Sequence, residues 1–237
     1  MKLVIGNKCY SSWSLRPWLL MRALGLDFIE VLVPFHTPDF NAVVSERAGG
    51  GSGKVPALSD DGVVIWESLA IMEYLAERFP AAGIWPADRA ARAHARAVAN
   101  EMHAGFRALR SACPMNLGRK HPPRDRGSDV AADVARITAL WREARERFGA
   151  GGGGPFLYGA FSAADAMYAP VVTRLETYSI AVDPVSRAYM DAVMAHPAFL
   201  EWRQAALSER WVVPEDEADE PTLRNYRDQL VVAAKAY

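Results

Sequence analysis

The chain of 237 residues contains only two cysteines, Cys9 and Cys113. Two such isolated cysteines fit neither a disulfide framework nor the spacing of a structural metal site, so we expect both to be reduced. The net charge of −1 excludes the strongly basic surface that nucleic acids or anionic membranes require. No stretch approaches the ~18 apolar residues of a membrane span, and the apolar run at the N-terminus is too short for a secretory signal. We therefore expect a soluble, cytoplasmic protein without a metal.

Apolar residues make up 51% of the chain and charged residues 23%. This balance is ordinary for a protein with a packed core, and the length suits one large domain or two modest ones.

Residues 1–80 predict a small α/β unit. We expect strands over 3–6 and 28–33, a hairpin of strands 55–58 and 63–66 across Asp61-Gly62, and helices over 14–24, 39–47 and 68–79. The order β-α-β-α-β-β-α is the topology of a thioredoxin-like domain.

Residues 81–87 predict a linker, and residues 88–237 predict an all-α domain. We expect one long helix over 88–113, ended by Pro114, and further helices over 128–148, 162–177, 184–195 and 197–208. The tail from Val213 is acidic and returns to a short helical stretch at its end.

Two segments of the α/β unit offer groups that suit a peptide-like ligand. Pro56 has no N–H and perturbs any strand pairing that it enters, which leaves free main chain at Val55. Glu67 and Ser68 open a helix, whose unpaired N–H groups and positive dipole end favour a carboxylate. Taken alone, the first segment also fits an edge-strand proline, and the second fits an ordinary helix cap.

A third segment, Ser11-Ser12-Trp13-Ser14, gathers hydroxyl groups where a strand meets a helix. A thiol with an ordinary pKa of about 8.5 needs ~2.7 kcal/mol of anion stabilisation to lower that pKa by ~2 units. One hydrogen bond to a charged group supplies about 1.5–3 kcal/mol, and a helix N-terminus adds about 0.3–1 kcal/mol. These serines can therefore hold a thiolate, or they can simply cap and turn the chain.

In this order, the three segments and a fourth, Phe161-Ser162-Ala163-Ala164-Asp165-Ala166, resemble the cytosolic glutathione S-transferases over nearly the whole chain. The serine segment is similar to the Ser-Ser-Cys-Ser sequence of the zeta class. Trp13 stands where that class has a cysteine, which counts against its maleylacetoacetate isomerase activity. The resemblance implies the glutathione transferase fold: a thioredoxin-like N-terminal domain followed by an all-α C-terminal domain.

The resemblance also implies glutathione as a co-substrate, a homodimer, a role in detoxification and a set of site residues. Ser11 or Ser12 would donate a hydrogen bond to the glutathione sulfur. A cis Val55-Pro56 bond would present main chain to the cysteinyl unit. The residues expected to contact glutathione are Trp13, Lys54, Val55, Pro56, Glu67 and Ser68. Cys9 is a competing candidate for the catalytic residue, because it would instead form a mixed disulfide with glutathione.

A small hydrophobic electrophile is expected beside the first helix of the second domain. The candidate residues there are Met102, His103, Phe106 and Arg110, of which His103 or Arg110 would polarise a carbonyl or neutralise an acid. Such a stripe also fits a helical core. Two alternative functions remain: a non-catalytic glutathione-binding or chaperone-like family member, and a glutathione-dependent disulfide reductase that uses Cys9.

Overall fold

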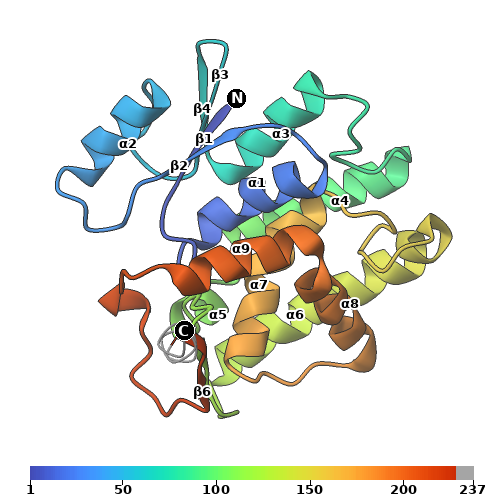
Figure 1. Cartoon of the computed structure of the whole chain (residues 1–237). Coiled ribbons are helices and arrows are strands. Elements are labelled where there is room, and N and C mark those ends of the chain that lie inside the picture. The colour runs from blue at the N-terminus through green and yellow to red at the C-terminus, as the bar shows by residue number, and fades with distance from the viewer. Residues whose placement is uncertain (228–237) are drawn as a thin grey trace, which may run out of the picture.

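The computed structural model describes residues 1–227. It has a small sheet with its own helices at the top of the view and a larger helical part below (Figure 1). This arrangement confirms the expected fold class. The short helical stretch predicted at the end of the tail lies largely outside the described residues.

The sheet is mixed, with the strand order β2-β1-β3-β4. Its strands are β1 (Lys2–Ile5), β2 (Ile29–Leu32), β3 (Ala57–Asp60) and β4 (Val63–Trp66), and the helices are α1 (Ser12–Ala23), α2 (Phe40–Ala48) and α3 (Ser68–Arg78). Strand β1 runs parallel to β2 and antiparallel to β3, so that Val4 lies between Val31 and Ala57. Leu3, Val4 and Ile5 are fully buried, which makes β1 the centre of this domain.

The helical part is built around α7, in which every residue except Glu176 is buried. Its helices are α4 (Arg89–Ala104), α5 (Arg107–Ala112), α6 (Ser128–Ala144), α7 (Ala163–Thr177), α8 (Pro184–Ala195) and α9 (Pro197–Ser208). Helix α7 packs against α1, which joins the two parts of the molecule through one continuous core.

The prediction of a single helix over residues 88–113 is wrong, because the helix is interrupted between α4 and α5. A side chain at Gly105 would lie 2.7 Å from the carbonyl oxygen of Glu101, and the next residue, Phe106, has a left-handed φ of 56°. Glycine is poorly stabilising inside a helix and permits this close approach. The break separates α4 from the short helix α5, which carries Arg107 and Arg110.

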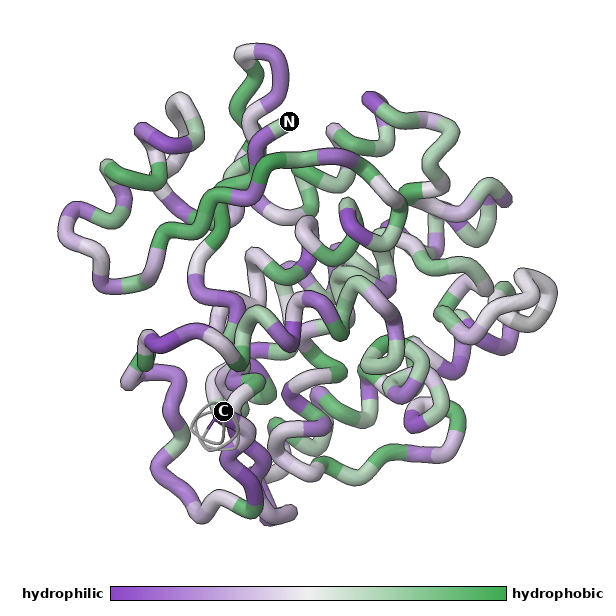
Figure 2. Tube along the Cα trace, in the orientation of Figure 1, coloured by the Kyte–Doolittle hydropathy of each residue, from purple (hydrophilic) through white to green (hydrophobic). Residues whose placement is uncertain are grey.

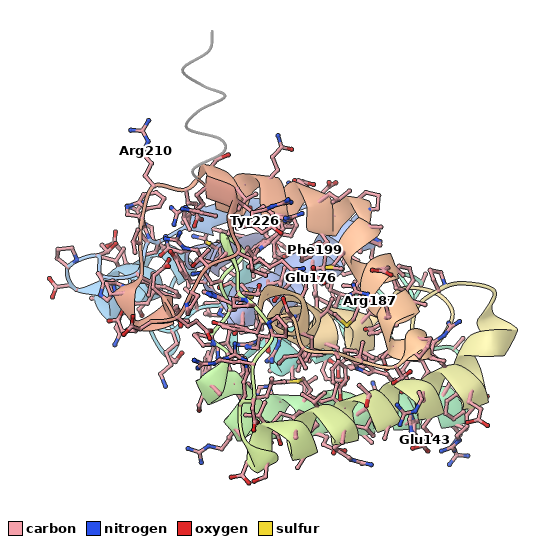
Figure 3. The ribbon with its side chains drawn as sticks, turned by 90° about the horizontal axis from the view of Figure 1, so that it is seen from below. Glu143, Glu176, Arg187, Phe199, Arg210 and Tyr226 are labelled. Atoms are coloured by element: carbon pink, nitrogen blue, oxygen red, sulfur yellow. The ribbon has the colours of Figure 1, made fainter. Side chains whose placement is uncertain are left out.

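The C-terminal segment, residues 209–227, folds back along the helical part and is mostly hydrophilic (Figure 2). Its short strand β6 (Arg224–Asn225) pairs with β5 (Arg119–Lys120) in the connection between α5 and α6. Tyr226 lies near Glu176 and Phe199, and all three line one small cavity (Figure 3). The segment therefore has fixed contacts with the rest of the molecule.

Within residues 1–227, no helix is both long and apolar enough to cross a membrane. The same part of the chain contains no group of three or more metal-ligating side chains that could hold an ion.

Ser162 and Asp165 form a capping box at the start of α7. The buried Asp165 carboxylate accepts hydrogen bonds from the main-chain N–H groups of Leu157 (3.0 Å) and Ser162 (2.9 Å). Asp165→Ala leaves both donors without an acceptor, so we expect a loss of about 2–3 kcal/mol in the free energy of unfolding, against ~1 kcal/mol for Ser162→Ala. Urea denaturation measures both values, and an equal loss in the two variants would contradict this account.

Candidate functional site

The serine segment lies where β1 ends and α1 begins, beside a large cavity. This cavity has a volume of about 800 Å³. It is lined by Tyr10, Ser11, Ser12, Trp13, Phe35, Phe40, Lys54, Val55, Ala104, Arg107, Arg110, Ser111, Pro114, Met115, Arg174 and Asp216. Because α1 points its N-terminus at this space, the free N–H groups of its first turn favour an anion there.

Ser11 is the N-cap of α1 and is almost fully buried. Its Oγ accepts a hydrogen bond from the Ser14 N–H at 3.3 Å and donates to Ser14 Oγ at 2.7 Å, while Ser14 Oγ accepts from the Gly6 N–H at 3.1 Å. Either hydroxyl in the Ser11–Ser14 pair can be the donor, because hydroxyl hydrogens rotate. The pair can therefore reverse and release the Ser11 hydrogen to a ligand in the cavity.

Ser12, the first residue of α1, is only partly buried, and its Oγ accepts a hydrogen bond from Arg174 Nη2 at 3.3 Å. The Arg174 side chain comes from α7 and also donates to the carbonyl oxygens of Cys113 (2.9 Å) and Pro170 (3.2 Å). Both predicted serines thus line the same cavity, and Ser12 accepts a hydrogen bond from a cation.

The Val55–Pro56 peptide bond is cis, as expected. Val55 lines the large cavity and also a second one of about 220 Å³, and no hydrogen bond engages its main chain within residues 1–227. Lys54 and Trp13 border both cavities, and Glu67 and Pro56 border the second. The structure therefore brings most of the predicted glutathione contacts around one continuous region.

Glu67 has an unusual backbone, with φ at 69° just before α3. Non-glycine residues with positive φ are uncommon and concentrate at functional sites. Its side chain is exposed and has its Oε2 3.9 Å from His103 Nε2. Ser68, by contrast, is fully buried and accepts a long hydrogen bond of 3.5 Å from Arg16 Nη1, so its side chain does not border either cavity.

The ring of Trp13, which borders both cavities, is in contact with several basic side chains. The guanidinium of Arg16 lies 4.1 Å from its ring centroid and that of Arg110 lies 4.9 Å away, both within the range of cation–π attraction. The His103 ring meets the Trp13 ring edge-on at 5.2 Å. Burial, followed by the charge of Arg16, lowers the pKa of His103, which favours the neutral imidazole.

Of the four residues predicted to contact an electrophile, only Arg110 lines either of these two cavities, although His103 also lies against Trp13. Arg110 lines the large cavity, whereas Met102 is fully buried and Phe106 is nearly so. His103 lies beside Glu67, near the smaller cavity. Burial, and next the charge of Arg107, lowers the pKa of Arg110, and both arginines line the large cavity.

Sequence reasoning missed Arg16, Arg107, Arg174 and Asp216. Arg16 is buried within an apolar helix face, and Arg174 lies inside the core helix α7. Asp216 reaches the cavity because hydrogen bonds hold the C-terminal segment to the residues just before the serine segment: Glu217 accepts from Tyr10 at 2.6 Å, and Glu209 accepts from the Lys8 N–H at 2.7 Å. No local signal marks contacts across so long a stretch of chain.

Cys9 is fully buried and does not line the cavity. Its Sγ lies 3.6 Å from Asn116 Oδ1, and burial raises its pKa to about 11. Because only the thiolate attacks disulfides, this environment favours a structural role over a redox role.

The site lies between a thioredoxin-like domain and a helical domain. Both domains match known protein families. The family model "Glutathione S-transferase, N-terminal domain" matches residues 10–78, and "Glutathione S-transferase, C-terminal domain" matches residues 124–205. Together they span more than half of the chain. The chain therefore belongs to the glutathione S-transferase family, whose members are glutathione-dependent enzymes.

Relatives and solved structures agree with this assignment. The chain is 31% identical to the maleylacetoacetate isomerase of Pseudomonas aeruginosa over 62% of its own length and 69% of that protein. It is 36% identical to a probable maleylacetoacetate isomerase of Caenorhabditis elegans over 47% and 53% of the two chains. A glutathione transferase homolog from Burkholderia GL BGR1, solved with bound glutathione, has the same fold at 23% identity, with a TM-score of 0.64 over 88% of this chain and 98% of that one.

We expect both cysteines to resist alkylation in the native protein. Burial raises the pKa of Cys9 and of Cys113 to about 11, so at pH 8 both thiols are protonated as well as shielded. Iodoacetamide labelling followed by mass spectrometry should show little modification of the folded protein and full modification in urea. Rapid labelling of native Cys9 would contradict its structural role and favour the disulfide reductase.

Proposed function

We propose that this protein is a glutathione transferase in which a serine hydroxyl at the start of α1 stabilises the glutathione thiolate for attack on a small electrophile. The observation that carries this proposal is the single cavity that joins Ser11 and Ser12 to the free main chain of Val55. A tripeptide that pairs with Val55 can place its sulfur at the helix N-terminus, where a thiolate is stabilised.

The remaining parts of glutathione fit the neighbouring groups. The cysteinyl unit would pair with Val55, and the γ-glutamyl end would occupy the smaller cavity beside Glu67, at the N-terminus of α3. Lys54 borders both cavities and would meet the glycine carboxylate. Each contact is of the kind that its partner needs: main chain for main chain, an acid for the ammonium group, and a cation for a carboxylate.

The electrophile would occupy the far part of the large cavity, between Trp13 and helix α5. Met115 and Pro114 provide apolar surface there, while Arg107 and Arg110 provide charge. This wall suits a small electrophile with an apolar body and an acidic or carbonyl group. A homodimer, a cytoplasmic location and a role in detoxification accompany this proposal as properties implied by the family resemblance.

Glutathione-assisted isomerisation of an unsaturated acid is the second candidate function. The paired cations Arg107 and Arg110 favour it, because they can hold a carboxylate while the thiolate adds to and leaves the double bond. The names of the two relatives are consistent with this chemistry. Both candidates share the first step, in which the glutathione thiol loses its proton to solvent.

Glutathione titration followed by thiolate ultraviolet absorbance tests the proposed function. The wild-type protein should bind glutathione and show a thiolate band at neutral pH. In Ser11→Ala/Ser12→Ala, the loss of a hydrogen bond to an anion should lower kcat/KM by about 10-fold or more and raise the pKa of the bound thiol. Binding without any thiolate band in the wild type would instead support the non-catalytic glutathione-binding member.

Arg110→Ala tests the acidic part of the electrophile. We expect a loss of about 10-fold or more in kcat/KM for electrophiles that carry a carboxylate, with a much smaller change for neutral ones, since one charge-assisted hydrogen bond is lost. Steady-state kinetics with matched acid and amide electrophiles measures the difference. Equal losses for both members of a pair would remove Arg110 from substrate recognition.

A further inference from the structure

Arg174 is a buried cation that the reaction outlined above does not yet use. Its side chain is nearly inaccessible, yet it forms part of the cavity wall. The guanidinium donates hydrogen bonds to the carbonyl oxygens of Cys113 and Pro170, which hold it in place. It also donates to Ser12 Oγ at 3.3 Å. A buried charge is costly, so its direct contact with a cavity serine calls for a reason.

The contact decides how the Ser12 hydroxyl is used. A guanidinium has only donors, so Ser12 Oγ must accept from Arg174, and the hydroxyl hydrogen is left to donate to another group. Ser12 borders the cavity, where that group would be a ligand atom. The Ser11 hydroxyl, in contrast, donates to Ser14 Oγ and reaches a ligand only when the direction of that hydrogen bond reverses.

The charges that face Arg174 come from each element around it. Arg16 on α1 and Arg110 on α5 are positive, Asp216 on the C-terminal segment is negative, and the thiol of Cys113 and the phenol of Tyr178 are neutral at pH 7. Burial, followed by the charge of Arg110, lowers the pKa of Arg174 to about 10, so the guanidinium is still charged at neutral pH. The cations outnumber the one carboxylate, and an anion beside Ser12 is favoured.

We propose that Arg174 is a positioning residue for the thiolate: it fixes the Ser12 oxygen as an acceptor, aims the hydroxyl hydrogen at the sulfur, and stabilises the anion through Ser12. This inference rests on the proposed function and makes Ser12, rather than Ser11, the residue that touches the sulfur. The proton of the thiol goes to solvent, and no further reactant is needed.

Asp216 should affect the bound thiolate in the opposite direction to Arg174. Its side chain borders the same cavity and, within residues 1–227, makes no hydrogen bond or ion pair, whereas its main-chain carbonyl accepts from Asn116. A negative charge at this wall opposes the effect of Arg174 on a thiolate. Removing it should therefore stabilise the bound thiolate, whereas weakening Arg174 should destabilise it.

The test is a pH titration of the thiolate absorbance of bound glutathione in Ser12→Ala, Arg174→Lys and Asp216→Asn, each checked for folding by circular dichroism. We expect the thiol pKa to rise by about 1 unit in Ser12→Ala, to rise by less in Arg174→Lys, which keeps the charge but loses the fork, and to fall by about 0.5 unit or more in Asp216→Asn. Asp219→Asn removes the same charge from an exposed position of the same segment and should leave the pKa unchanged.

The outcomes separate this inference from the proposed function. A wild-type thiolate band that none of Ser12→Ala, Arg174→Lys and Asp216→Asn moves would overturn the role of Arg174 and leave the family chemistry intact. A shift in Ser11→Ala with none in Ser12→Ala would also overturn it. The absence of any wild-type thiolate band would instead remove the proposed function. Because the Asp216 side chain makes no hydrogen bond or ion pair within residues 1–227, Asp216→Asn breaks no such contact and keeps the test decisive if Arg174→Lys fails to fold.

Discussion

The packing of α1 against α7 is the constraint on which the site depends. It fixes the N-terminus of α1 at the end of β1, and it brings Arg174 of α7 to within hydrogen-bonding distance of Ser12. The same core contact joins the two domains, so the position of the serines and the position of the helical wall are set together. A change in this packing would move the serines and the arginines relative to each other.

Positive charge concentrated in a partly buried space is unfavourable until an anion enters it. Arg16 and Arg110 lie over Trp13, and Arg174 lies behind Ser12, while the chain as a whole has a net charge of only −1. The ring of Trp13 offsets part of this repulsion through its electron-rich face. Glutathione, with two carboxylates and a sulfur that can ionise, is the kind of ligand that such a space favours.

The sequence predicted the α/β topology well because strands, turns and caps have local signals, such as Asp61-Gly62 and the hydroxyls before α1. It missed the break at Gly105 because the alanine-rich pattern continues on both sides. The serines, Val55 and Glu67 could be selected from local motifs and the family resemblance. Arg174 and Asp216 could not be selected in this way, since their roles come from contacts between distant segments. An arginine within a helical sequence is normally predicted to face solvent.

The most direct test of the account is the structure of this protein with glutathione bound. We expect the cysteinyl main chain to pair with Val55 and the sulfur to lie about 3–3.5 Å from a serine hydroxyl at the start of α1. An empty cleft at saturating glutathione, or a sulfur far from both Ser11 and Ser12, would contradict the central claim.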